Sequence, residues 1–256
     1  MNQRRWEEMT DLHVITYRID EKDAAGGFGL KPFEYAEVGE IRGQRVCHLQ
    51  CHIGDGSFGL AQLGAAEVVG VDFSTRSIDV ARMRAERLGL TDRVRFVHAA
   101  VEEAAAVLGA SFDGVYTTWG VLAWLPDIRT WAENVSGLLK SRGWLYLADT
   151  HPYAAAVRWA SYPYGGNPPV YDDTHGDYTD AHATFEHPES WQCNHGLGEI
   201  VTALTDVGMG LEWLHEHPDV AWHMGDPERL VERSDRMWEE PGSTLPLSFS
   251  LRAIKR

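Results

Sequence analysis

The chain has 256 residues and a net charge of −15 at pH 7, which argues against nucleic acid or an anionic membrane surface as its partner. It contains no run of about 18 apolar residues that would cross a bilayer, and its first residues lack the apolar core of a signal peptide. Its three cysteines suit a reducing compartment without structural disulfides. These features predict a cytoplasmic protein built as one α/β domain with an elaboration or a small cap. They leave open whether it is a monomer or a homodimer.

Residues 1–40 come before the regular part of the chain. They predict two short helical stretches around the flexible AAGGFG segment, which would form a lid. Regular alternation then follows. The predicted strands are Val46–Cys51, Glu67–Asp72, Val94–His98, Phe112–Thr118, Trp144–Asp149, Leu211–His217 and Leu247–Ile254. The predicted helices between them are Phe58–Leu63, Thr75–Leu88, Glu102–Leu108, Ile128–Leu139 and Leu197–Val207.

Strands that alternate with helices at this spacing predict a parallel sheet covered by helices on both faces, with right-handed crossovers. The pattern breaks at residues 151–195, which are rich in aromatic residues, Gly, Pro and His, and predict a cap of loops and short strands. The end of the chain reads helix, strand, long connection and strand. This order predicts a final strand that lies antiparallel beside the preceding one.

The stretch Arg45–Ser74, RVCHLQCHIGDGSFGLAQLGAAEVVGVDFS, is typical of the first βαβ unit of a nucleoside-binding sheet. The glycines let the backbone approach a ligand, and Asp72 ends the second strand, where an acid accepts hydrogen bonds from ribose hydroxyls. The segment GDGSFG matches the G-x-G-x-x-G pattern of NAD-binding proteins. However, Asp55 would place a carboxylate beside a pyrophosphate. A sulfonium cofactor without phosphate suits that carboxylate better, and Gly59 falls where it would serve only close packing.

The motif CHLQCHIGDGSFGLAQLGAAEVVGVDFS resembles the LHLQCHxGxDTLxLARLGA-type motif of a bacterial group of class I S-adenosylmethionine-dependent methyltransferases that act on small molecules. Four further segments resemble that group in the same order: FDGVYTTWGVLAWLPD, LLKSRGWLYLADTHP, NHGLGEIVTAL and LPLSFSLRA. The resemblance covers roughly residues 40–254. It implies a Rossmann-like, doubly wound, seven-stranded mixed sheet whose last strand is antiparallel. The implied division is a helical lid at 1–40, a cofactor-binding core at 41–150, a cap insertion at 151–196 and completion of the sheet at 197–256.

The resemblance also implies the residues that bind S-adenosylmethionine. The first-loop glycines of the wider family align with Gln50, His52 and Gly54, and only the last is a glycine here. The acid that usually contacts the adenine amino group is replaced by Ala100. The predicted cofactor-binding residues are Gln50, His52, Gly54, Asp72, Phe73, Ala100, Val101 and Trp119. Gly54 would leave room for the methionine part of the cofactor, and Phe73 would pack either on the adenine or in the core.

The run Cys47 to His52 at first resembles a metal-binding sequence. On a strand, Cys47 and Cys51 would share one face, and His48 and His52 the other. Neither face alone completes a tetrahedral site, and the spacing fits neither a zinc pair nor a haem motif. The sequence therefore predicts no metal site there. It predicts buried cysteines, with the two histidines at the cofactor end.

The acceptor side is predicted from position and residue type. His151 follows the fifth strand and His195 opens a late helix, so each is a candidate general base. Methyl transfer can also proceed by alignment alone, without a base. The candidate acceptor contacts are Tyr17, Trp119, Trp124 and Tyr153. The acidic-Pro-Pro-aromatic loop of enzymes that methylate nucleobases is absent after the fourth strand.

The sequence thus predicts transfer of a methyl group from S-adenosylmethionine to an O or N atom of a small aromatic or heterocyclic metabolite of specialised metabolism. Two alternatives remain open. One is an NAD-dependent oxidoreductase, which the glycine pattern permits and which requires a positive residue near the loop. The other is a non-catalytic protein that keeps the methyltransferase fold, suggested by the altered first loop and by Ala100.

Overall fold

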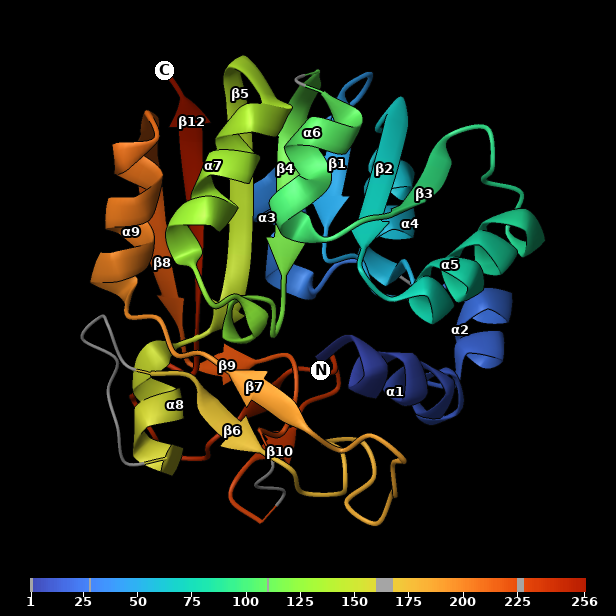
Figure 1. Ribbon diagram of the computed structural model, residues 1–256, viewed down its shortest axis with the longest axis vertical. Helices are drawn as coiled ribbons and strands as arrows, with labels where there is room; N and C mark the ends of the chain where they lie inside the picture. Colours follow the sequence, from blue (N-terminus) through green and yellow to red (C-terminus); the bar gives the residue numbers. More distant parts are fainter. Residues whose placement is uncertain (1, 28, 110, 160–167, 225–227) are drawn as a thin grey trace.

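The structure is a computed structural model that describes residues 2–27, 29–109, 111–159, 168–224 and 228–256. Its centre is a seven-stranded sheet in the order β3-β2-β1-β4-β5-β12-β8 (Figure 1). The strands are β1 (Arg45–Leu49), β2 (Glu67–Asp72), β3 (Val94–His98), β4 (Phe112–Thr118), β5 (Leu139–Thr150), β8 (Met209–His217) and β12 (Ser248–Lys255). β12 pairs antiparallel with both β5 and β8, while β1 to β5 are mutually parallel. The predicted seven-stranded mixed sheet with an antiparallel last strand is confirmed.

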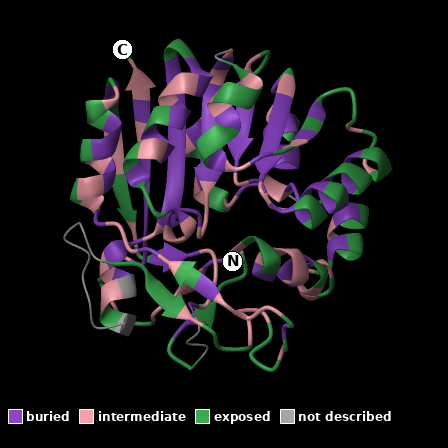
Figure 2. Ribbon diagram, viewed as in Figure 1, coloured by how far each residue is buried: buried purple, intermediate pink, exposed green. Residues whose placement is uncertain are grey.

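Side chains that alternate along the strands supply two separate cores. Leu49, Val71 and Leu147 pack into one core, whereas Val46, Val68 and Tyr146 pack into the other. The central strands β1, β2 and β4 are therefore buried on both faces, as the purple centre of the sheet in Figure 2 shows, whereas the edge strands β3 and β8 are partly exposed. Double burial requires apolar residues at most positions of the central strands.

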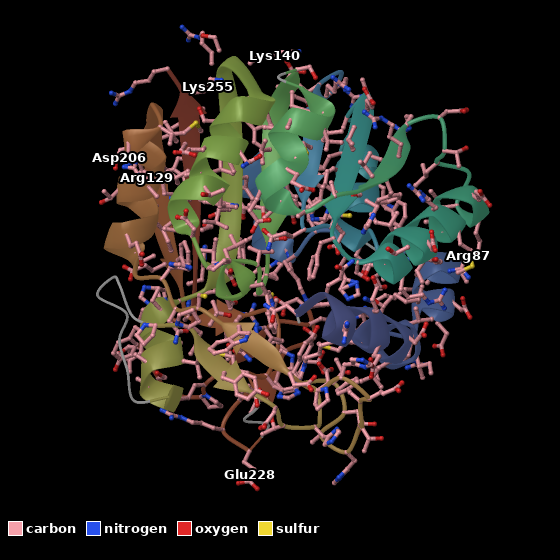
Figure 3. The ribbon with its side chains drawn as sticks, viewed as in Figure 1. Arg87, Arg129, Lys140, Asp206, Glu228 and Lys255 are labelled. Atoms are coloured by element: carbon pink, nitrogen blue, oxygen red, sulfur yellow. The ribbon has the colours of Figure 1, made fainter. Side chains whose placement is uncertain are left out.

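Helices cover both faces of the sheet. α6 (Ala104–Leu108), α7 (Ile128–Leu138) and α9 (Leu197–Asp206) contribute to the core that contains Leu49. α3 (Pro32–Val38), α4 (Asp55–Gln62) and α5 (Thr75–Arg87) contribute to the core that contains Val46. In Figure 1, α6 and α7 lie in front of the sheet, with α3 and α4 behind it. At the outer edge, Arg129 of α7 pairs with Asp206 of α9 at 2.6 Å (Figure 3).

A second layer of structure faces the carboxyl ends of the parallel strands (Figure 1). It contains α1 (Asn2–Thr16), the hairpin of β6 (Val170–Asp172) and β7 (Ser190–Gln192), and α8 (Pro152–Trp159). A small sheet of β9 (Asp219–Val220), β10 (Val231–Glu232) and β11 (Trp238–Glu239) completes it. Ligands of α/β sheets of this kind bind just outside the carboxyl ends of the strands. A ligand here would therefore lie between the sheet and this second layer.

The N-terminal segment contains more helix than predicted. α1 precedes the AAGGFG segment, α2 (Ile19–Ala25) ends on its two alanines, and α3 follows it; residue 28 of that segment lies outside the described residues. The chain passes very close to α4 here, since a Cβ on Gly59 would lie 2.7 Å from the Cα of Gly29. Gly59 therefore serves close packing, as the sequence suggested.

The expected face-sharing of the two cysteines is wrong. β1 ends at Leu49, and Gln50 then adopts a φ of 54°. This left-handed residue ends the strand alternation, so Cys47 packs in one core and Cys51 in the other. Both thiols are buried and unpaired by disulfides.

The division of the chain into lid, core, cap and completion stays a prediction. Residues 160–167 of the predicted cap lie outside the described residues. The segment 219–239, which belongs to the predicted long connection, adds a small sheet to the same layer. Among the described helices, no span is long and apolar enough to cross a bilayer.

Candidate active site

A cavity of about 1450 Å³ lies between the carboxyl edge of the sheet and the second layer. Sites for one small ligand are usually about 300–1,000 Å³, so this volume leaves room for two. The first loop, the segment after β4, α1 and both inserted segments all contribute to its wall. Of the predicted site residues, Tyr17, Gln50, His52, Asp72, Phe73, Trp119, Trp124 and His195 line it.

Asp72 lies at the end of β2 with only 7% of its surface exposed. One carboxylate oxygen accepts the backbone N–H of His52 at 2.8 Å, and the other accepts that of Ser74 at 2.9 Å. Burial raises the pKa of Asp72 to about 6 against these hydrogen bonds. Each oxygen has a further lone pair, so the group has acceptor capacity left for two hydroxyls of a cavity ligand.

Two residues of the loop after β1 carry buried polar atoms that have no protein partner. The Gln50 amide donates from Nε2 to the carbonyl of Val121 at 2.9 Å, while its Oε1 is unpartnered. The Nδ1 of His52 is unpartnered as well. Gln50 and His52 have φ values of 54° and 47°, an uncommon conformation for side-chain-bearing residues. Backbone strain and unpaired polar atoms in one loop are typical of a functional segment.

Gly54 ends that loop with a φ of 92° and caps α4. A Cβ there would lie 2.8 Å from the ring of Phe96 and 3.1 Å from that of Phe58, so packing and backbone conformation both require glycine. The extra atom would therefore enter the core, and the reason predicted for this glycine is wrong. Its backbone contact with a cofactor stays a prediction. The neighbouring Gly56 does line the cavity, and a Cβ there would meet His48 at 2.8 Å.

Asp55 lies at the start of α4 and also lines the cavity. It pairs with Lys22 at 3.0 Å and with the fully buried Arg84 at 2.6 Å. Burial alone would raise the pKa of Asp55, but these cations outweigh burial and hold it below the usual range. Arg84 also holds Asp23 of α2 at 2.6 Å and the Ile53 carbonyl at 2.7 Å. Positive residues therefore do lie near the glycine loop, and Asp55 neutralises them.

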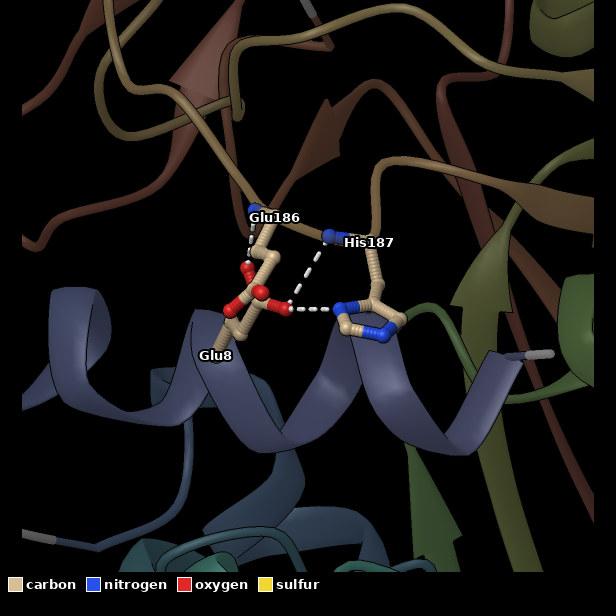
Figure 4. Close-up of side chains that lie close together, drawn as sticks. All are labelled: Glu8, Glu186 and His187. Atoms are coloured by element: carbon tan, nitrogen blue, oxygen red, sulfur yellow. Dashed lines mark hydrogen bonds and ion pairs between the residues drawn. The ribbon is translucent and has the colours of Figure 1, made fainter.

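Helix α1 joins the sheet to the cap through two adjacent glutamates. Glu7 accepts the backbone N–H groups of Thr75 at 2.8 Å and Arg76 at 2.7 Å, at the start of α5. Glu8 accepts the backbone N–H groups of Glu186 at 2.6 Å and His187 at 3.0 Å, and Nδ1 of His187 at 2.9 Å (Figure 4). Both carboxylates thus fasten the lid, one on each side of the cavity.

Glu8, Glu186 and His187 also lie close enough together to hold a metal ion. The Glu8 oxygens already accept three hydrogen bonds from the other two residues. These hydrogen bonds account for the geometry, and the cluster acts as a fastening between α1 and the cap.

A buried chain of side chains crosses the cavity wall from cap to loop. Asp177 lies 3.2 Å from Nε2 of His13, and Nδ1 of His13 lies 2.8 Å from Nε2 of His52. Burial would raise the pKa of Asp177, but the His13 contact outweighs it and keeps that pKa low. With Asp177 ionised, His13 donates to it and His52 donates to His13, which leaves Nδ1 of His52 as a bare acceptor. Burial lowers the pKa of His52 to about 3, so the ring is neutral.

Trp119 follows β4 with a φ of 62°, and its indole N–H donates to Glu34 at 2.8 Å. Glu34 also accepts the hydroxyl of Tyr116 at 3.1 Å. The carboxyl is 1% exposed, and this burial raises its pKa to about 7. Glu34 thereby fixes the indole of Trp119 in the wall of the cavity.

Asp149, at the end of β5, organises the segment after β4. Its carboxylate accepts backbone N–H groups from Gly120 at 2.7 Å, Val121 at 3.1 Å and Leu122 at 3.0 Å. The backbone carbonyl that holds the Gln50 amide belongs to this same segment. One buried acid therefore shapes the loop opposite Asp72.

The two predicted bases differ in their placement. His151 is not among the lining residues; its Nδ1 accepts the N–H of Tyr153 at 3.0 Å, and its Nε2 lies 3.0 Å from Glu216. His195 lines the cavity, but Nε2 donates to the Leu125 carbonyl at 2.8 Å and Nδ1 faces Glu199 at 3.3 Å. Both nitrogens of His195 are thus engaged, whereas Nε2 of His151 has an ionic contact with Glu216 but no hydrogen-bond partner within the described part of the chain. The role of either histidine as a base stays a prediction.

Some of the remaining predicted residues line the cavity and others do not. Trp124 lines the cavity and meets Trp6 edge-on at 5.3 Å, and Tyr17 stacks on His13 at 4.7 Å. Phe73 lines the cavity near Asp72. The lining residues do not include Ala100, Val101 or Tyr153, whose predicted ligand contacts stay predictions.

Sequence reasoning missed several residues that shape the site: Trp6, His13, Glu34, Asp149 and Asp177. Glu34 carried a local signal, because an acid three residues into a helix is typical of a capping box, and α3 begins at Pro32. His13 and Asp177 carried none. They meet only because α1 and the cap fold over the same edge of the sheet.

Part of the chain is similar in sequence to known methyltransferases. Residues 46–143 match the family described as "Methyltransferase domain". A ubiquinone biosynthesis O-methyltransferase of Leptothrix cholodnii is 35% identical over 111 residues, 43% of this chain and 46% of that protein. One from Chromobacterium violaceum is 31% identical over 126 residues, 48% and 53% of the two chains. The chain thus spans about half the length of the curated relatives it matches.

Solved structures extend the likeness to the whole fold. An S-adenosylmethionine dependent methyltransferase from Mesorhizobium loti has a TM-score of 0.58 at 18% identity, covering 88% of this chain and 96% of that one. One from Methanosarcina mazei has a TM-score of 0.59 at 18% identity, covering 89% and 98%. Residues 46–143 thus match a methyltransferase domain, and the chain as a whole has the class I methyltransferase fold. The fold that the sequence motifs implied is thereby confirmed, whereas the NAD-binding alternative gains no support from these comparisons.

Proposed function

We propose that the chain is an S-adenosylmethionine-dependent methyltransferase that methylates an O or N atom of a small aromatic or heterocyclic metabolite. The observation that carries this proposal is the cavity of about 1450 Å³, with Asp72 and the strained first loop on one side and an aromatic lid and cap on the other. Such a volume admits a nucleoside cofactor and an acceptor together.

The residues present fit the cofactor. Asp72 has spare acceptor capacity for the two ribose hydroxyls, and the orphaned Oε1 of Gln50 has room for a donor such as an ammonium group. The cofactor has no phosphate, so the neutralised Asp55 cluster imposes no charge conflict. When bound, S-adenosylmethionine would supply a methyl group on a sulfonium, open to direct displacement by the acceptor.

The chain's own residues position the acceptor and exclude water. Trp119, held by Glu34, and Trp124, packed on Trp6, present flat apolar surfaces to the cavity. Helix α1 closes over them through Glu7 and Glu8. Because both ring nitrogens of His195 are engaged and His151 does not line the cavity, alignment of the two reactants is the main catalytic contribution expected.

O-methylation is supported by the curated relatives named ubiquinone biosynthesis O-methyltransferase. The fold by itself does not fix the reaction. A geranyl diphosphate C-methyltransferase from Streptomyces coelicolor, determined with S-adenosyl-L-homocysteine, has a TM-score of 0.59 at 16% identity, and a [4+2]-cyclase has one of 0.53 at 14%. A role in specialised metabolism and a cytoplasmic location stay predictions from the sequence.

The test is calorimetric titration of the full chain with S-adenosylmethionine, S-adenosylhomocysteine and NAD in parallel. Micromolar binding of the first two with no NAD binding supports the proposal, and mass spectrometry of an acceptor panel then identifies the methylated product. Binding of NAD alone would overturn it. Cofactor binding without transfer to any acceptor would favour the non-catalytic alternative.

A further inference from the structure

Two positively charged side chains line the cavity without a carboxylate partner among the described residues. Lys31 precedes α3, and Arg236 lies in the turn between β10 and β11. Nζ of Lys31 makes only long contacts to the backbone carbonyls of Ala221 at 3.4 Å and Arg236 at 3.3 Å. Within the described residues, no acid lies within 4 Å of either charged group. Both groups therefore retain unused donors toward the cavity.

Other cationic residues of the cavity wall are already engaged. Lys22 pairs with Asp55 at 3.0 Å, and Arg229 pairs with Glu240 at 2.5 Å. Arg5 donates to the carbonyls of Thr174 at 3.0 Å and Gly176 at 3.1 Å. On a chain with a net charge of −15, acidic partners are plentiful, which makes two unpaired cations at one place informative.

The acids on this side of the cavity are directed elsewhere. Glu34 is held by Trp119 and Tyr116 and does not reach the Lys31 ammonium within 4 Å. Glu232 is exposed on β10 and pairs with neither cation. Burial lowers the pKa of Lys31; the nearby acids Glu34 and Asp55 oppose this effect, and the cations Lys22 and Arg236 add to it. An anion placed beside the buried Lys31 ammonium would stabilise its charged form.

We propose that Lys31 and Arg236 form a binding site for the carboxylate of a ligand in the cavity. The inference rests on the proposed function, which supplies two possible sources of that carboxylate: the methyl acceptor or the aminoacyl end of the cofactor. Both cations line the cavity and are near enough to interact electrostatically, and Arg offers the paired donor geometry that carboxylates favour. Trp222 and Trp238 line the same part of the cavity and would flank a flat acid.

Two binding experiments on the full chain distinguish the sources. The first compares S-adenosylhomocysteine with methylthioadenosine, which keeps the nucleoside and thioether but lacks the aminoacyl carboxylate. The second compares benzoate with its neutral counterpart benzamide at saturating S-adenosylhomocysteine. Each is measured by calorimetry for wild type, Lys31→Met, Arg236→Gln and the double variant. Arg129→Gln, which removes the same charge from the outer surface, is the matched control.

We expect the double variant to lose about tenfold in affinity for one carboxylate ligand while its neutral counterpart changes by less than about twofold. Loss on S-adenosylhomocysteine assigns the site to the cofactor, and loss on benzoate assigns it to the acceptor. Lys31→Arg should restore most of the affinity, which separates lost charge from damage to the fold.

The inference is overturned if neither carboxylate ligand is weakened, or if each is weakened as much as its neutral counterpart. Wild type that binds neither S-adenosylhomocysteine nor methylthioadenosine instead contradicts the proposed function. The benzoate comparison, run without cofactor, then still tests Lys31 and Arg236.

Discussion

The two sides of the cavity are built by different means. On the sheet side, buried carboxylates hold backbone N–H groups: Asp72 fixes the first loop, and Asp149 fixes the segment after β4. On the lid and cap side, side chains from distant segments hold one another, as Asp177, His13 and His52 do. The sheet side is thus specified by contacts near the strand ends, whereas the other side depends on long-range pairing.

We expect the sheet side of the cavity to be rigid and the lid to be more mobile. Backbone hydrogen bonds to buried acids are costly to break, because they leave orphaned groups without water. The fastenings of α1 are partly exposed, and they can open at smaller cost. We therefore expect the lid to control ligand entry while the sheet side keeps its geometry.

The exception on the lid side is Arg84, which should produce the largest effect. Its fully buried guanidinium joins Asp23 of α2 to Asp55 of α4. Arg84→Met leaves Asp23 as a buried charge with only the half-exposed Arg87 nearby, so we expect a loss of about 3–5 kcal/mol in the free energy of unfolding. Urea titration measures it.

The matched control for Arg84 is Arg129, which makes an ion pair of the same length with Asp206 on the surface (Figure 3). Arg129→Met should cost less than about 1 kcal/mol, since exposed ion pairs contribute little. Equal losses for the two variants would show that α2 is not anchored by burial.

Glu34 gives a pH-dependent effect of nearly the same size. Burial raises its pKa from 4.5 to about 7, so the folded state holds this proton more tightly than the unfolded chain does. Its contribution to stability is fully present below pH 4.5 and is lost as the pH rises through about 7, by about 3 kcal/mol in total. Glu34→Gln should remove this dependence.

The measurement for Glu34 is the difference in unfolding free energy between wild type and Glu34→Gln at pH 4.5, 6 and 8. The difference isolates this group, because Asp72, which also titrates near pH 6, is common to both proteins. If this difference stayed constant from pH 4.5 to 8, Glu34 would not have the raised pKa assigned to it. The assignment is supported if the variant becomes more stable relative to wild type at high pH.

Asp72 should affect ligand binding more than stability. Ribose hydroxyls would donate to its carboxylate, so Asp72→Asn should weaken S-adenosylhomocysteine roughly 10- to 100-fold. Since the pKa of Asp72 is about 6, wild-type affinity should also fall about tenfold between pH 7 and pH 5. Calorimetry at several pH values should show no such fall for Asp72→Asn. If the affinity of this variant fell with pH as that of the wild type does, the assignment would be refuted.

The sheet side was the predictable part of the molecule. Strand-length apolar runs and the strand-end position of Asp72 fixed the order of elements, because parallel strands must bury both faces. The sequence failed where the backbone departs from regular geometry. The left-handed Gln50 moved Cys51 into the other core, and the Cβ position of Gly54 pointed toward Phe96.

The lid and cap side was predictable only in composition. Aromatic residues indicated a pocket wall, and Tyr17 and Trp124 do line the cavity. The pairing of His13 with Asp177 joins residues 164 positions apart and leaves no periodic signal. His151 shows the opposite case: its position after the fifth strand favoured it as a base, but it does not line the cavity, and its Nδ1 accepts the backbone N–H of Tyr153.

The smallest and most direct test uses the two adjacent glutamates of α1. Glu7→Gln should loosen the helix from the start of α5, and Glu8→Gln should loosen it from residues 186–187 (Figure 4). Each should cost about 1 kcal/mol or less in global stability, because both carboxylates are partly exposed. Hydrogen exchange should locate the effect, with faster exchange at Thr75 and Arg76 in the first variant and at Glu186 and His187 in the second. If either change instead raised exchange equally at both regions, α1 and the cap would open together. The boundary between the rigid and the mobile side of the cavity would then lie at α1.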